Sequence, residues 1–340
     1  MSDLALAQLS MASLYSAMGV LTLAMLAYAA HLAWLLPARS EAKDLKAAQA
    51  AHAAERQREL APVGGGPTAG GEHPAYEVGG DAPTEAHDDK EPLRARKAAG
   101  IAGALSILGT LLLTAAVVLR GLEVHRMPLG NMFEFAITGA MFVMLAYTGW
   151  SLRRDLRWLG VFITGPVLIT LGMAVTVWYV DAAELMPSLK SYWLVIHVTI
   201  ATIAMALFGI GAAINGLYLW QDRVEGGTTR SFMNRLPAAR QLEKLAYGLH
   251  VIAFPLWTFT VIAGAIWARQ AWGSYWNWDP KEVWSFVIWV VYAAYLHARV
   301  TSGWRRQNAA MIALAGFACI IVNYGIVNVF FVGQHSYSGL

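Results

Sequence analysis

Charge is scarce in this chain. Asp, Glu, Lys and Arg supply only 14% of its 340 residues, whereas soluble domains carry about 25%. Hydrophobic residues make up 57%, and the mean hydropathy is +0.46. A soluble fold would have to bury more uncharged stretches than its core could hold, so we exclude a water-soluble globular protein.

Cysteine is nearly absent too. Cys319 is the single one, so the chain has no internal disulfide and is not itself a thiol–disulfide carrier. No Gly-rich phosphate loop follows a strand pattern, and the basic residues form no cluster typical of nucleic-acid binding, so no nucleic-acid partner is expected. Any chemistry of this protein must therefore use other groups.

The chain contains several long runs of uncharged residues. Several exceed the roughly 18 residues that indicate a membrane-spanning helix, and three weaker candidates accompany them. We predict an all-α polytopic integral membrane protein with about eight transmembrane helices. The predicted spans are residues 4–38, 98–119, 135–152, 158–180, 191–220, 245–268, 283–298 and 308–333. The first has no basic n-region and no clear cleavage site, so we expect a retained helix rather than a signal peptide.

The distribution of basic residues predicts which side each loop faces. With both termini outside, the inner segments hold 20 of the 25 Lys and Arg; these segments are 37–97, 153–157, 221–246 and 299–306. Without the long first segment, 11 inner residues still stand against 5 outer ones. Because cytoplasmic loops are enriched in Lys and Arg, we predict both termini and loop 269–284 on the outer face. The bilayer itself is expected to be a bacterial cytoplasmic membrane.

Residues 37–97 differ in composition from everything else in the chain. They are rich in Ala, Gly, Pro and charge, and a segment with so little to bury does not offset its ordering entropy. We predict a disordered cytoplasmic linker there, between an N-terminal transmembrane helix (1–36) and a membrane domain (98–340). Its three histidines are widely spaced and are expected to be solvated: His52, His73 and His87.

The stretch WGSYWNWDPKEVW, residues 272–284, has a partly local explanation. Asp279 is a favourable N-cap, proline is tolerated at the first helical position, and Glu282 completes a capping box. The sequence therefore predicts that a helix begins here, at the membrane surface.

The tryptophans of this stretch need a further explanation. Six of the chain's 14 lie within residues 267–289, among them Trp272, Trp276 and Trp278. An interfacial aromatic belt would distribute them over several helix ends, but here they crowd one connection, where Gly273 permits close backbone approach. We therefore favour a flat apolar ligand that stacks on the indole faces.

Two histidines suggest what that ligand is. His197 lies just inside the outer end of the fifth predicted span, and His335 follows the last span on the same side. Two neutral imidazoles beside an aromatic slot are what a six-coordinate haem iron requires. Since an ionisable group within a span is a functional candidate by default, we predict haem ligation by His197 and His335.

The remaining histidines are placed by depth. His297 lies 14 residues after the start of its span, about 21 Å further in at 1.5 Å per residue, and so in the inner half of the bilayer. His31 and His250 fall at a similar depth, and we expect each to hydrogen-bond a neighbouring helix. His125 is expected to be a surface residue of an outer loop.

Several short segments of the sequence resemble those of a known family. WGSYWNWDPKE resembles the WWD signature of haem-handling cytochrome c biogenesis proteins, which by itself leaves the CcmC and CcmF branches open. The segments WLVIH, YLHAR and GQHSY, around the three histidines, are similar to those of the CcsA (ResC) branch, called System II. MPLGNMFEF, residues 127–135, also resembles that branch. The resemblance covers roughly residues 100–340, whereas residues 37–97 match no motif of the family.

The resemblance implies a function. In the family, haem b crosses the membrane as a transient cargo to an outer site under the WWD loop. There it is held by two histidines, which correspond to His197 and His335. His297 matches the inner transmembrane histidine, and its opposite ligand comes from a partner membrane protein, CcsB (ResB), so neither His31 nor His250 is chosen. Trp272, Gly273, Trp276, Trp278 and Asp279 belong to the WWD motif.

The cargo is attached to apocytochrome c, whose Cys-x-x-Cys-His motif forms thioethers with the haem vinyl groups. The chain would then be a component of a cytochrome c haem lyase (holocytochrome c synthase) complex, orienting haem without an activated nucleophile of its own. Arg269 and Lys281 flank the loop and are candidates to pair with haem propionates.

Two other functions are alternatives to haem delivery. A b-type electron-transfer protein would hold haem permanently between facing helices, and His197 and His335 fit that as well. A ligand near the chain terminus, however, suits haem handover better. A solute transporter ranks last, because no conspicuous intramembrane acid or run of charges marks a coupling path.

Overall fold

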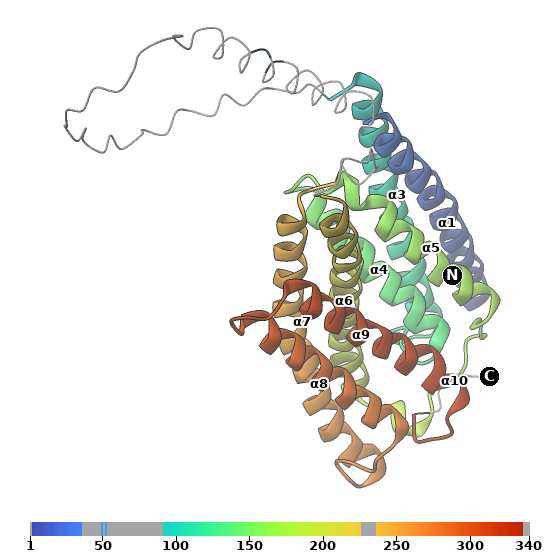
Figure 1. Cartoon of the computed structure of the whole chain (residues 1–340). Helices are drawn as coiled ribbons and strands as arrows, with labels where there is room; N and C mark the ends of the chain where they lie inside the picture. Colours follow the sequence, from blue (N-terminus) through green and yellow to red (C-terminus); the bar gives the residue numbers. More distant parts are fainter. Residues whose placement is uncertain (1, 36–48, 50–51, 53–90, 226–235, 336–340) are drawn as a thin grey trace, which may run out of the picture.

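The computed structural model describes residues 2–35, 49, 52, 91–225 and 236–335. Among these, eight helices are long and apolar enough to span a membrane, which confirms the predicted fold class (Figure 1). They are α1 (Asp3–Trp34), α3 (Leu93–Glu123), α4 (Met132–Ser151), α5 (Gly160–Thr176, after the 3-10 turn η1 Arg157–Leu159), α6 (Tyr192–Val224), α7 (Ala239–Trp272), α8 (Pro280–Val300) and α9 (Arg306–Ile321). The last span continues through a π-helical turn, η4 (Val322–Val327), into α10 (Asn328–Phe330), and a 3-10 turn, η2 (Pro187–Leu189), precedes α6.

The predicted boundary between the linker and the membrane domain falls inside a helix. Helix α3 begins at Leu93 rather than near residue 98, so residues 93–97 belong to the helix and not to the linker. Their basic side chains resemble linker composition, but a helix readily extends past the membrane surface into water. The linker's disorder, with His73 and His87, lies outside the described residues.

Local capping explains where two helices of the site begin. Asn131 caps α4 by accepting the backbone N–H of Glu134 at 2.8 Å. At α8 the predicted capping box is present: the Asp279 side chain accepts backbone N–H groups, and Glu282 reaches back to the N–H of Asp279 at 3.1 Å. Such caps contribute about 0.5–2 kcal/mol, and here they set the start of both helices at the same end of the protein.

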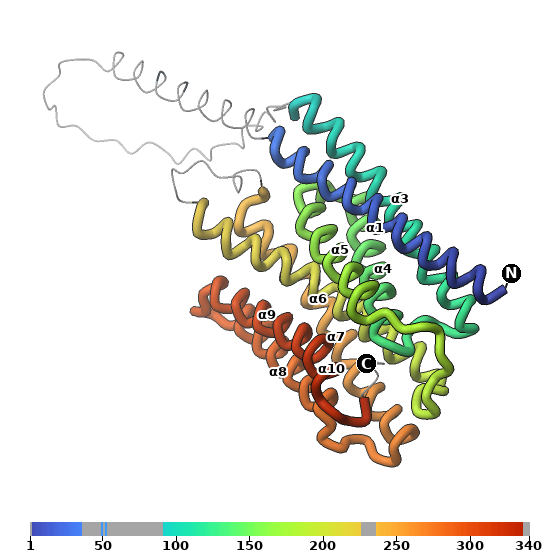
Figure 2. The backbone as a smooth tube through the Cα atoms, turned by 90° about the vertical axis from the view of Figure 1, so that its right-hand side faces the viewer, coloured from blue at the N-terminus to red at the C-terminus, as the bar shows by residue number. Residues whose placement is uncertain are grey.

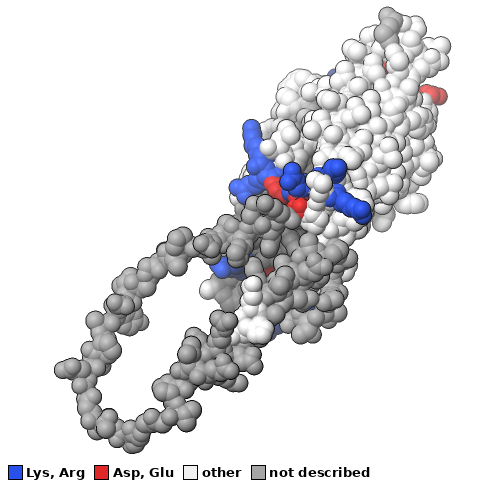
Figure 3. All heavy atoms as spheres, turned by 90° about the horizontal axis from the view of Figure 1, so that it is seen from above, with Lys and Arg blue, Asp and Glu red and all other residues white. Residues whose placement is uncertain are grey.

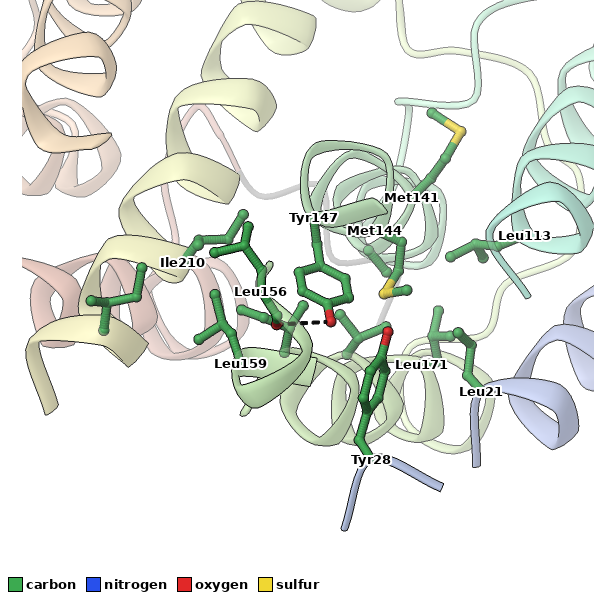
Figure 4. Close-up of a cluster of buried hydrophobic side chains, with 14 of the residues drawn as sticks. Leu21, Tyr28, Leu113, Met141, Met144, Tyr147, Leu156, Leu159, Leu171 and Ile210 are labelled. Atoms are coloured by element: carbon green, nitrogen blue, oxygen red, sulfur yellow. Dashed lines mark hydrogen bonds between the residues drawn. The ribbon is translucent and has the colours of Figure 1, made fainter. Parts of the chain in front are cut away.

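The helices pack around two cores (Figure 2). In the first, α1 lies along α3, α1 packs against α5, and α3 packs against α4. Figure 4 shows its centre, where the Tyr147 hydroxyl donates to the carbonyl of Leu156 at 3.3 Å and the Tyr28 ring meets Tyr147 edge to face. In lipid, close van der Waals packing and satisfied polar groups hold helices together, because the surrounding chains are equally apolar.

The second core joins α8 and α9 to the α6–α7 pair. Phe208 and Tyr292 stack at its centre with ring centroids 3.7 Å apart, and Trp257 packs against Phe208. Helices α6 and α7 contribute to both cores, so they lie between the two groups, as Figure 2 shows.

The two ends of the bundle differ in character. At the loop end, which carries residues 124–131, 177–191, 273–279 and 331–335, a small apolar cluster that includes Leu129, Leu189 and Leu194 ties the connections together. At the opposite end, which carries the end of α1 and the start of α3, Lys and Arg side chains gather on the surface (Figure 3). Arg299 and Arg306 there pair with the buried Glu243. This separation matches the predicted inner segments; which end faces the cytoplasm stays a prediction.

Candidate functional site

A cavity opens between the two cores at the loop end. Its empty volume is about 1280 Å³ with the open mouth included. Its walls come from the start of α4, the first turns of α6, the last turns of α7, the following loop, the start of α8 and η4.

Both predicted outer ligands line this cavity. His197 projects from α6, where its ring lies edge-on to Trp267 with centroids 5.6 Å apart. Gly264 of α7 makes room for the imidazole, because a Cβ at that position would lie 2.8 Å from Cε1 of His197. His197 is therefore held at the wall by helix packing.

His335 follows the last span and also lines the cavity, where the connection between α7 and α8 holds it. Its Nδ1 lies 2.8 Å from Oδ1 of Asp279, and its ring is 4.7 Å from that of Trp272. Burial raises the pKa of Asp279, but the hydrogen bond from His335 and those from the N–H groups of Gln334 and Lys281 outweigh it, so the pKa is lowered. Asp279 is thus an anion at neutral pH.

The tryptophans of the motif separate into two groups. Trp272 and Trp276 line the cavity. Trp278 does not; it has a left-handed backbone (φ 59°), and 77% of its surface is exposed. Gly273 is the left-handed C-cap of α7 (φ 83°), so its role in the structure is to end the helix, and it is not among the cavity-lining residues.

Further aromatic residues complete the walls. Phe135 and Tyr324 stack with centroids 5.1 Å apart, and Trp257, Trp267 and Tyr275 also face the cavity. Phe135, Trp257 and Tyr324 lie far apart in the sequence, on α4, α7 and η4, so the sequence did not link them to the loop. The π-helical turn that carries Tyr324 is of a kind that is often found at functional sites.

The two candidate basic residues differ in position. Lys281 lines the cavity, where its Nζ donates to the carbonyl of Asn323 at 3.2 Å and to Oδ1 of Asn328 at 2.6 Å. Arg269 is exposed, donates to the carbonyl of Gly273 and lies over the Tyr275 ring. Lys281 can meet an anionic group of a ligand in the cavity, whereas Arg269 holds the loop.

A buried ion cluster supports the wall opposite the loop. Glu134 of the MPLGNMFEF segment is fully buried and accepts from Arg126 Nη1 at 2.6 Å, Arg120 Nε at 3.3 Å and the N–H of Gly130 at 2.8 Å. Arg120 also donates to the carbonyl of Val180 at 3.1 Å. The segment that resembles the family is thus tied to the loop before α6, and Gly130 itself lines the cavity.

The other histidines lie outside the cavity. His297 is exposed on α8. His31 is buried, with Nδ1 3.1 Å from the carbonyl of Ala95, and His250 is buried with Nε2 3.4 Å from Nδ2 of Asn215. Both contact a neighbouring helix as expected. His125 is exposed, as expected, with φ 53°.

Comparisons with known proteins agree with these features. The family described as cytochrome C assembly protein matches residues 126–335. A protein named cytochrome c biogenesis protein CcsA from Parasynechococcus marenigrum (strain WH8102) is 33% identical over 267 residues, covering 70% of this chain and 86% of the relative. The CcsA proteins of Mesostigma viride (33% identical; 69% and 85% covered) and Chlamydomonas reinhardtii (35%; 68% and 66%) are similar.

Proposed function

Since this chain belongs to the CcsA family of cytochrome c biogenesis proteins, we propose that it carries haem across the membrane to the cavity under the WWD loop. There it would present haem to apocytochrome c. The observation that carries the proposal is the meeting of two distant histidines, His197 and His335, at one aromatic cavity.

The residues present suit this cargo. Imidazole nitrogens are common axial ligands of haem iron, and Trp272 and Trp276 offer faces for a macrocycle. Bound haem would supply two vinyl groups, each of which accepts a cysteine sulfur on one carbon and the thiol proton on the other. The chain's part is to hold the macrocycle, exclude water and leave one edge open at the mouth.

We further propose that the cavity lies on the outer face of the membrane and that the chain works with a membrane partner protein. The basic residues gathered at the opposite end support a cytoplasmic location for that end. His297 is exposed on α8, so an opposite ligand from a CcsB (ResB) type partner would have access to it. The inner site is therefore proposed to form between two proteins.

Transfer of haem to an acceptor tests the function directly. The chain, purified with its CcsB-type partner, is expected to carry haem and to lose it to a reduced peptide containing Cys-x-x-Cys-His. Covalent attachment is measured by haem staining of the peptide after denaturing electrophoresis. A protein that binds haem, cycles between its two oxidation states and never labels the peptide would instead support the alternative, a b-type electron-transfer protein.

Lys281 is proposed to pair with a haem propionate. Lys281→Gln is expected to weaken haem retention by roughly 10-fold or more, because a hydrogen bond to a charged group contributes about 1.5–3 kcal/mol. Dissociation is followed by transfer of haem to apomyoglobin. Arg269→Gln, outside the cavity, is the matched control and should change retention little. Equal loss with haem dimethyl ester, which has no free carboxylate, would contradict the pairing.

A further inference from the structure

Asp279 of the WWD loop makes more contacts than a helix cap requires. Its Oδ1 accepts the N–H of Lys281 at 3.0 Å, which is the capping bond. The same oxygen lies 2.8 Å from Nδ1 of His335, and Oδ2 accepts the N–H of Gln334 at 2.6 Å. One buried carboxylate therefore joins the start of α8 to the terminal segment that carries a proposed ligand.

The terminal segment is shaped to reach this carboxylate. A Cβ at Gly333 would lie 2.3 Å from Oδ2 of Asp279, so only glycine lets the backbone approach so closely. Gln334 adds a second tie, because its Oε1 accepts from Nδ2 of Asn277 at 3.1 Å. Residues 333–335 (GQH), after the last span, thus contact residues 277–279 (NWD) of the loop.

The contact determines which nitrogen of His335 carries a proton. An ionised carboxylate only accepts hydrogen bonds, so Nδ1 must donate, and in the neutral imidazole Nε2 then carries the lone pair that binds a metal. A carboxylate on the far nitrogen also makes an imidazole a stronger electron donor, and such partners fix ring orientation at metal sites.

We infer that Asp279 is a positioning residue for the haem iron. It holds His335 in the Nδ1–H tautomer and strengthens it as a ligand, above all toward ferric iron. This rests on the proposed function, in which His335 binds the iron. It gives the aspartate of the WWD motif a role at the iron through the histidine, in addition to its role as a helix cap.

The isosteric variant Asp279→Asn tests the role, because asparagine is an equally good N-cap. Loss of the carboxylate is expected to weaken ferric haem retention about 10- to 100-fold, as for other outer-shell partners, and to raise the midpoint potential of the bound haem. A tenfold loss confined to the ferric state corresponds to about 59 mV. Gly333→Ala, which pushes the segment from the carboxylate, should shift both in the same direction. The control Asn277→Ala removes the contacts with Gln334 and Ser274 but leaves the carboxylate of Asp279 in place, so the potential should be unchanged.

Ligand rescue separates a role through the histidine from a merely structural one. In His335→Gly, added imidazole retains an N–H for Asp279, whereas 1-methylimidazole does not. We expect a lower potential with imidazole, and a difference between the two ligands that shrinks when Asp279→Asn is added. A difference independent of Asp279 would overturn the inference. If wild type holds bis-histidine haem but Asp279→Asn changes neither retention nor potential, the inference fails alone; absence of such haem from wild type would refute the proposed function.

Discussion

Replacing His197 and His335 together by alanine is expected to abolish the bis-histidine haem spectrum of the purified chain. Both side chains line the same cavity, and each supplies an imidazole that no neighbouring side chain of the described cavity wall replaces. Haem retention should fall by more than about 100-fold, beyond what the loss of one outer-shell partner costs. The absorption spectrum of protein coexpressed with its partner measures this.

The two single variants test each histidine position separately. Each alanine leaves the space of one ring, so added imidazole should restore a six-coordinate spectrum to His197→Ala and to His335→Ala. His125→Ala, in a loop at the same end but not lining the cavity, is the control and should retain haem. If the double variant keeps an unchanged six-coordinate spectrum, the ligand assignment is wrong, and the tryptophans must be interpreted as an interface anchor.

Glu134→Ala is expected to cause the largest loss of stability. The fully buried carboxylate pairs with Arg120 and Arg126, and Arg120 has a second acidic partner in Glu123. Removal of one partner from a buried ion cluster costs about 3–5 kcal/mol, because the charge of Arg126 is then left without its carboxylate partner. The walls at Gly130 and at residues 177–191 should loosen together, and haem retention should fall with them. Thermal unfolding in detergent and proteolysis of that loop measure the effect.

An exposed acid in the same region provides the control for this variant. Glu184 pairs with Lys190 at 3.2 Å on the surface, and such exposed pairs contribute little, so Glu184→Ala should unfold as the wild type does. Wild-type stability and haem retention in Glu134→Ala would show that the cluster is not needed to hold the wall.

The meeting of His197 and His335 at one cavity could be anticipated from the sequence, but the contacts that hold them could not. His197 and His335 were predicted because their contexts and depth place them at one membrane face. The contact of His335 with Asp279 was missed, since a capping box already accounted for the aspartate. Neither spacing nor composition reveals that one carboxylate serves two segments that are distant in the chain.

Side-chain direction was likewise beyond the sequence. Trp278 has the same motif context as Trp276, yet its left-handed backbone turns it out of the cavity. Lys281 and Arg269 flank the loop symmetrically in sequence, but only Lys281 faces inward. A side chain's direction depends on the local φ and on the neighbouring element, and both are settled only when the helices pack.

The sequence alone determined those features that depend only on the chemistry of a short segment. Uncharged runs of membrane length make eight spanning helices, because backbone groups in lipid must be satisfied within each helix, and an Asp-Pro-Lys-Glu step caps α8 locally. The tertiary structure decided the cavity, the ion cluster around Glu134 and the Asp279–His335 contact. Each of these needs groups from separate helices or loops at hydrogen-bond distance, and only the packing of the two cores brings those groups together.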